Sequence, residues 1–158
     1  MSVEFVATEW DSYDVQAETL EEAAEAISDL EEAATAEWFP RYEYEADQFV
    51  TSAVVTVATK ITMPRWVGVE SAGAAERAEW ERFCAALRSH EEGHVQLVTK
   101  VLADVDTHLI GESVDAARKV WDRTLEALAV ASRAYDLQTD HGRKLGTVLD
   151  LSVSDPVR

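Results

Sequence analysis

The stretch AAERAEWERFCAALRSHEEGHVQLVTKVLADVDTHL, residues 74–109, decides the fold. Its apolar side chains recur every three to four residues, which is the period of an α-helix with one buried face. The residues on that face are Ala75, Ala78, Trp80, Phe83, Leu87, Leu97, Val98, Val101, Leu102 and Val105. The pattern predicts a single long helix over 74–109, and Gly111 marks its end.

A second helical pattern follows at once. Its apolar stripe consists of Val114, Ala117, Trp121, Leu125, Leu128 and Ser132. We expect this helix to start at Ser113 and to end near Tyr135–Asp140, ahead of Gly142. Because the connection between the two helices is short, they are predicted to pack as a helical hairpin.

N-terminal to these two helices, apolar residues recur at every second position instead. Residues 41–45 alternate strictly after Pro40, and Ser52–Met63 alternates over a longer run. Val55, Val57, Thr59, Ile61 and Met63 share one face of that run. The pattern predicts two neighbouring strands in an antiparallel hairpin. A first strand is expected within Val3–Val15.

An Ala/Glu-rich segment, Glu18–Glu37, predicts an N-terminal helix. Thr19 is the expected N-cap, with Glu22 as its capping-box partner. The fold class is therefore α+β: one N-terminal helix and a small antiparallel sheet, followed by the helical hairpin. The length of 158 residues fits a single domain over residues 1–158.

Composition excludes several classes of partner. The chain has 31 acidic and 14 basic residues and a net charge of −17. Such a field repels nucleic acid and anionic membranes, and no apolar stretch approaches the ~20 residues that a membrane helix needs. Residues 1–5 lack the features of a signal peptide, so the chain as encoded is expected to be cytoplasmic. Cys84, the one cysteine, excludes an intrachain disulfide.

The long helix carries the pattern H-E-x-x-H at His90-Glu91-Glu92-Gly93-His94. Residues i and i+4 of a helix lie on one face, so the two imidazoles can bind one Zn²⁺ at ~2.0–2.1 Å. The glutamate at i+1 lies beside the open metal position, where it can take a proton from a metal-bound water. Glu91 is therefore the predicted general base.

The context of the motif favours a metal. His90, Glu91 and His94 continue the apolar stripe of their helix. A buried polar group without a partner costs about 1–3 kcal/mol, so three of them need compensation. A bound divalent cation supplies this compensation. The alternative is a pair of core histidines bonded to backbone or side chains.

A catalytic zinc usually has three protein ligands and one water. His108 lies some ~20 Å farther along the predicted helix than His94 and cannot reach the same ion. His141, after the second helix, is the better candidate. Glu126 within that helix is the alternative, and Glu112 is less favourable because it lies in the far turn.

Three residues near His141 have possible supporting roles. Tyr135 can donate a hydrogen bond to an oxyanion, or it can be a core aromatic. Asp136 or Asp140 can orient His141 through its second ring nitrogen, or can lie at the surface. The residues alone do not decide between these interpretations.

Four segments occur in an order that resembles a bacterial family of predicted secreted zinc-dependent proteases. They are Met63-Pro64-Arg65-Trp66, Trp80-Glu81-Arg82-Phe83, His90–His94 and Tyr135-Asp136-Leu137-Gln138-Thr139-Asp140-His141-Gly142. The resemblance implies a zincin-like fold, with His90, His94 and His141 as zinc ligands and Glu91 as the catalytic glutamate. The chain departs from the family in lacking a secretion signal and a cysteine between its long helices.

Motif and resemblance together predict a zinc-dependent hydrolase, with a peptide or protein as its substrate and Zn²⁺ as its cofactor. Glu91 and Tyr135 are the predicted catalytic residues. A non-catalytic zinc-binding or interaction module of the same fold is the alternative. Hydrolysis of a non-peptide amide is a third possibility.

Overall fold

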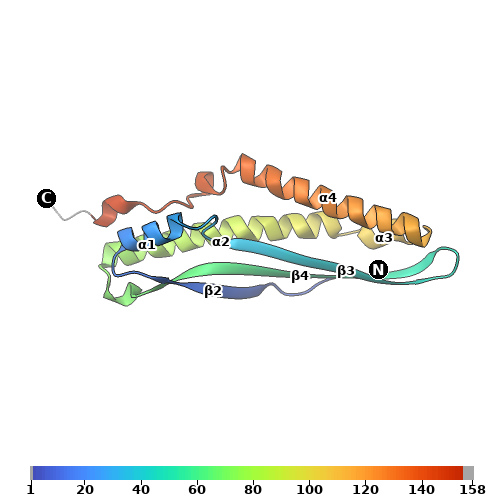
Figure 1. Cartoon of the computed structure of the whole chain (residues 1–158), viewed down its shortest axis with the longest axis horizontal. Coiled ribbons are helices and arrows are strands. Elements are labelled where there is room, and N and C mark those ends of the chain that lie inside the picture. Colours follow the sequence, from blue (N-terminus) through green and yellow to red (C-terminus); the bar gives the residue numbers. More distant parts are fainter. Residues whose placement is uncertain (1, 155–158) are drawn as a thin grey trace. The chain divides into compact units, whose positions relative to one another are not determined.

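The computed structural model describes residues 2–154 and has the mixed α+β composition that the sequence predicts (Figure 1). Its elements in chain order are β1 (Val3–Phe5), β2 (Glu9–Gln16), α1 (Leu20–Ser28), β3 (Thr35–Ala46), β4 (Val50–Val67), η1 (Val69–Ser71), α2 (Ala74–Leu102), α3 (Val105–Leu109), α4 (Val114–Gln138), η2 (Arg143–Leu145) and η3 (Leu151–Ser154).

The prediction of an antiparallel sheet is wrong for the pair of β1 and β4. These strands run parallel, with Val3 opposite Val55 and Phe5 opposite Val57. The chain between them passes through α1 and β3, which is long enough for the crossover that parallel strands require. β4 also pairs with β2 and β3. Residues 47–49 join β3 to β4, a connection of hairpin length.

The predicted faces of β4 are confirmed. Val55, Val57 and Ile61 are fully buried, whereas Val54 is 47% exposed. Burial alternates because successive side chains of a strand point to opposite faces of the sheet.

The N-terminal helix is shorter than predicted. Thr19 caps it, and its side chain accepts a hydrogen bond from the backbone N–H of Glu22 at 3.1 Å, as expected. The helix ends at Ser28, however, and the chain from Thr35 belongs to β3. Pairing with β4 outweighs the local helix propensity of residues 35–37. Pro40, expected to interrupt the pattern, lies within β3.

The long helix is interrupted once. The sequence predicts one helix over 74–109, but α2 ends at Leu102 and the short α3 follows. At the break, the backbone N–H and the hydroxyl of Thr107 both bond the carbonyl of Asp104. α4 ends at Gln138, within the predicted range.

The chain forms two compact units. The first contains the chain up to Glu9, Glu37–Lys60 and Gly93–Gln138. The second contains Trp10–Ala36, Ile61–Glu92 and the chain from Thr139 onward. Each unit draws on three separate segments, and both β4 and α2 contribute to both units. The single domain over residues 1–158 stays a prediction.

Each unit has its own core. In the first, fully buried side chains of β4, α2, α3 and α4 cluster together, among them Val57, Leu102 and Leu128. In the second, the aromatic rings of Trp66 and Trp80 pack edge to face with centroids 5.6 Å apart, beside Leu20 of α1. α2 contributes Val98 and Leu102 to the first core and Trp80, Phe83 and Leu87 to the second, and it carries the candidate site.

Candidate metal centre

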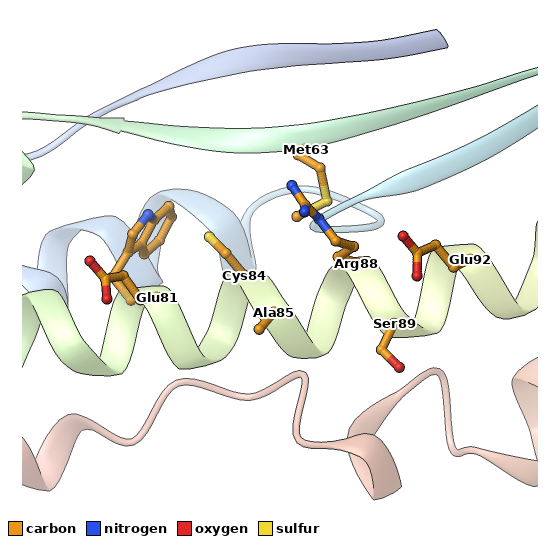
Figure 2. A pocket seen from close by; sticks show the side chains of 8 residues that line it. Met63, Glu81, Cys84, Ala85, Arg88, Ser89 and Glu92 are labelled. Atoms are coloured by element: carbon orange, nitrogen blue, oxygen red, sulfur yellow. The ribbon is translucent and has the colours of Figure 1, made fainter. Parts of the chain in front are cut away.

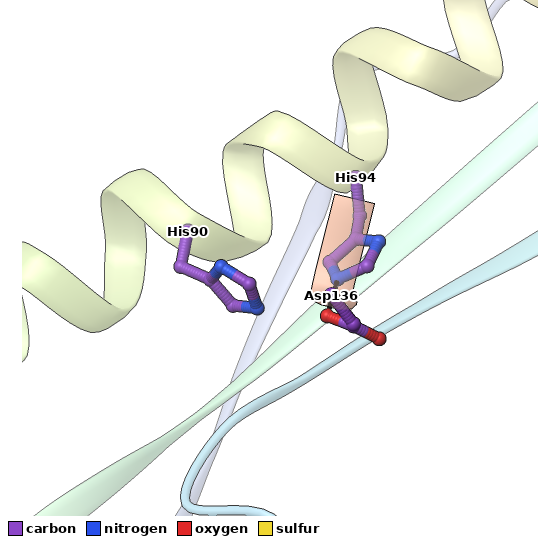
Figure 3. Close-up of side chains that lie close together, drawn as sticks. All are labelled: His90, His94 and Asp136. Atoms are coloured by element: carbon purple, nitrogen blue, oxygen red, sulfur yellow. Dashed lines mark hydrogen bonds and ion pairs between the residues drawn. The ribbon is translucent and has the colours of Figure 1, made fainter. Parts of the chain in front are cut away.

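The H-E-x-x-H motif lies in the middle of α2, as predicted. His90, Glu91 and His94 are only 5–6% exposed. Because α2 is continuous from Ala74 to Leu102, the two histidines project from the same face one turn apart (Figure 3). The expected burial of the motif is therefore observed.

Asp136 of α4 joins the two histidines. One ligand atom from each of His90, His94 and Asp136 lies within 4.8 Å of the others (Figure 3). Two imidazoles and one carboxylate are the donor set of many catalytic zinc sites, in which a water takes the fourth position. The chemistry of these three side chains and the burial of the two histidines fit a divalent cation.

His94 is held from both of its ring nitrogens. Nε2 lies 2.9 Å from Oδ1 of Asp136, and Nδ1 lies 2.9 Å from Oγ of Ser132. Asp136 and Ser132 are four residues apart on α4 and therefore share a face. A serine hydroxyl can donate or accept, so Ser132 supports either tautomer of His94. With Nδ1–H donating to Ser132, Nε2 would carry no hydrogen, and an ion between Nε2 and Asp136 would replace their hydrogen bond.

Sequence reasoning assigned these two residues differently. The sequence pattern places Ser132 only in the apolar stripe of its helix, and it suggests Asp136 as a partner of His141. The detectable signal was the spacing: a serine within an apolar stripe, four residues before an aspartate, predicts two polar groups on one buried helix face. Ser132 is in fact 9% exposed.

Tyr135 lies against the motif. Its ring meets that of His94 nearly at right angles, at 84°, with centroids 4.8 Å apart. A Cβ atom at Gly93 would overlap the hydroxyl oxygen of Tyr135. The glycine of the motif therefore permits the close approach of Tyr135 to α2.

His141, the third ligand expected from sequence, lies in an exposed turn after α4. Asp140 and His141 both adopt left-handed backbone conformations, with φ of 50° and 54°. The following Gly142 packs on the ring of His90, where an added Cβ would come within 3.0 Å of Cγ. Among the described residues, the group of side chains that could hold a metal ion contains Asp136 and not His141. The role of His141 as a ligand stays a prediction.

The other ligand candidates lie apart from the group. Glu126 is exposed on α4, and Glu112 is exposed in the turn before it. His108 is also exposed and lies 3.6 Å from the carboxylate of Asp104. None of these three belongs to a cluster of metal-ligating side chains in the described part of the chain.

A pocket of about 440 Å³ opens on another face of α2, between that helix and Met63 of β4 (Figure 2). Arg88 and Glu92 line it, and helix geometry places Arg88 roughly 160° around α2 from His90. The pocket is therefore separate from the group of His90, His94 and Asp136. Cys84 also lines it, and burial raises the pKa of this thiol to about 11.

Comparison with known proteins identifies a family. The model of a family described as "Bacterial protein of unknown function (DUF922)" matches residues 10–142, which include His90, His94 and Asp136. No curated protein and no solved structure matches the chain. Within residues 2–154, no helix is both long enough and apolar enough to span a bilayer.

Proposed function

Since the chain belongs to this bacterial family of unknown function, its activity has to be inferred from the site, and we propose that it is a zinc-dependent hydrolase of the metallopeptidase class. One observation carries the proposal. Two buried imidazoles of α2 and the partly buried carboxylate of Asp136 lie together, and α2 also carries a buried glutamate, Glu91, next to His90 that is not part of this group. A metal kept only for structure has no need of such a glutamate.

His90, His94 and Asp136 would hold the ion. When bound in such a site, Zn²⁺ lowers the pKa of a coordinated water to ~7 and polarises the carbonyl of a substrate. Ser132 keeps the ring of His94 in its ligating orientation through the contact at Nδ1.

Glu91 is the proposed general base. It follows His90 directly in α2 and is 5% exposed. Its carboxylate takes the proton of the attacking water and passes it to the leaving amine. Tyr135 is proposed to donate its hydroxyl proton in a hydrogen bond to the oxyanion. The contact of its ring with His94 holds it beside the group.

The decisive variant is Glu91→Gln, with Glu92→Gln as its matched control because Glu92 is the exposed neighbour. Both proteins should bind zinc, since neither residue is a proposed ligand. Only Glu91→Gln should lose hydrolysis, by ~10²–10⁴-fold, because an amide cannot accept the proton of the water. The assay measures zinc content together with cleavage of a peptide library and of unfolded proteins.

Two results would contradict the peptidase proposal. Equal cleavage by wild type and Glu91→Gln would place the activity elsewhere. Stoichiometric zinc in a folded wild-type protein that cleaves nothing in the library would favour the non-catalytic zinc-binding module.

A further inference from the structure

The chain after Gly142 forms a strap, residues 143–154, that follows α2 backward from the motif (Figure 1). Gly142, just before the strap, packs on His90, and Gly146 packs against Arg82 and Ala86. Farther along, Ser154 lies 3.4 Å from Oε2 of Glu76. The strap therefore covers the helix face that continues from His90 toward the start of α2.

Two side chains of α2 hold the strap by its main chain. Arg82 donates to the carbonyl oxygens of Gly146 at 2.8 Å and of Val148 at 2.6 Å. Oε2 of Glu79 accepts from the backbone N–H of Asp150 at 2.6 Å. The three bonded residues lie two positions apart, and all three bonds are made to main-chain atoms. Gly146 has a left-handed backbone conformation with φ of 91°, and a Cβ there would come within 2.8 Å of Arg82 Nη1, so the first of these positions requires a glycine.

Glu79 and Arg82 also bond each other. Glu79 is 6% exposed and forms an ion pair with Arg82, in which Arg82 Nη2 lies 3.1 Å from Glu79 Oε2. The hydrogen bond from Arg82 holds the pKa of Glu79 below the usual value of glutamate, against the opposing effect of burial. The ion pair therefore holds in place the N–H donors of Arg82 and the acceptor oxygen of Glu79 that bond the strap.

The strap itself is lightly anchored. Leu145 and Val148 are 44% and 55% exposed, and the partly buried Leu149 and Val153 supply its apolar contacts with the core of the second unit. The family match ends at residue 142, so the strap also lies outside the region that defines the family. A segment with so few buried side chains can open without unfolding the core.

We propose that the face of α2 formed by Glu79, Arg82 and Ala86 is a binding site for the main chain of a polypeptide segment. Residues 146–150 of the strap occupy this site as a built-in ligand. A polypeptide that displaces the strap would follow the same path toward His90. That last step rests on the proposed hydrolase, whereas the binding site itself does not.

The test uses the full chain with Leu149→Asp and Val153→Asp, which remove the apolar anchors of the strap. The probe is a fluorescein-labelled synthetic peptide with the native sequence of residues 143–154, and its anisotropy is measured with metal-free protein. We expect saturable binding to the released variant. Wild type should bind at least tenfold more weakly, because its tethered strap competes at high effective concentration.

Two changes test main-chain recognition. Adding Arg82→Ala to the released variant should weaken binding at least tenfold. Arg77→Ala, which removes an exposed arginine of the same helix that bonds Glu70, should leave binding unchanged. A peptide methylated on the backbone nitrogen of Asp150 should also bind at least tenfold more weakly, and this change leaves the protein intact.

Three outcomes would overturn the binding site. They are absence of saturable binding to a folded released variant, equal binding of the methylated peptide, and loss of the circular dichroism signal in the released variant. The last would make the strap part of the core. Because the assay needs neither metal nor Glu91, its failure is distinguishable from failure of the proposed hydrolase.

Discussion

Gly93 stands in the interior of α2, where a glycine ordinarily destabilises a helix by roughly 0.5–1 kcal/mol relative to alanine. Gly93→Ala should nevertheless lower the stability of the fold, because the new methyl group would overlap the Tyr135 hydroxyl. We expect the free energy of unfolding to fall by about 1–3 kcal/mol, the usual cost of overpacking, as measured in urea.

Gly73→Ala is the control for that variant. Its added Cβ would meet Glu76 at 3.7 Å, an ordinary contact. A higher unfolding midpoint for Gly93→Ala than for wild type would show that Tyr135 does not pack on α2 as described.

Ser132 is the second test at the scale of single residues. Ser132→Ala removes the group bonded to Nδ1 of His94 and leaves the three proposed ligands in place. Zinc affinity, measured by competition with a chelating dye, should fall by roughly 10–100-fold, as is typical for loss of a partner of a ligating histidine. Ser89→Ala, on an exposed position of α2, should have no effect. Unchanged affinity in both variants would contradict the role of Ser132.

At the scale of elements, variants in the turn after α4 test whether Asp136 or His141 is the third ligand. His141→Gly and Asp140→Gly both relieve a left-handed backbone conformation and both increase the entropy of the unfolded chain. These effects oppose each other, so the free energy of unfolding should change by less than about 1 kcal/mol. With Asp136 as the ligand, both variants should keep wild-type zinc affinity. Loss of affinity in His141→Gly alone would identify His141 as a ligand.

The contact of α2 with the strap predicts a pH dependence. The pKa of Glu79 is lowered in the folded protein, so its stabilisation is present above the unfolded value of ~4.3 and is lost as pH falls through the folded value. Wild type should therefore exceed Glu79→Gln in free energy of unfolding at pH 7, and the difference should shrink as pH falls below the unfolded value. A constant difference between pH 7 and pH 3 in urea titrations would reject this role.

At the scale of the whole molecule, zinc should stabilise the fold. Ligand at 100-fold above its dissociation constant adds ~2.7 kcal/mol, which corresponds to a rise in Tm of about 5–10 °C for a chain of this size. Scanning calorimetry with and without zinc measures the shift. The His90→Ala/His94→Ala double variant serves as control and should show none. An equal shift in that variant would mean that zinc binds elsewhere.

The sequence by itself determined the features that depend on the local spacing of apolar and polar residues. The helical stripe placed His90 and His94 on one buried face, because residues four apart on a helix necessarily share a side. The alternation within Ser52–Met63 gave the correct faces of β4, and Thr19 gave the start of α1. Each of these features depends on neighbours within a few residues.

Only the tertiary structure decided which distant residues meet. Asp136 and Ser132 reach His94 across 42 and 38 positions of chain, a pairing that depends on how α4 packs and not on any local pattern. The parallel ladder of β1 with β4 likewise has no local signal, since one strand alone does not record its neighbour's direction. Residues 35–37 form a strand against their helix propensity because β4 supplies the hydrogen bonds of a sheet.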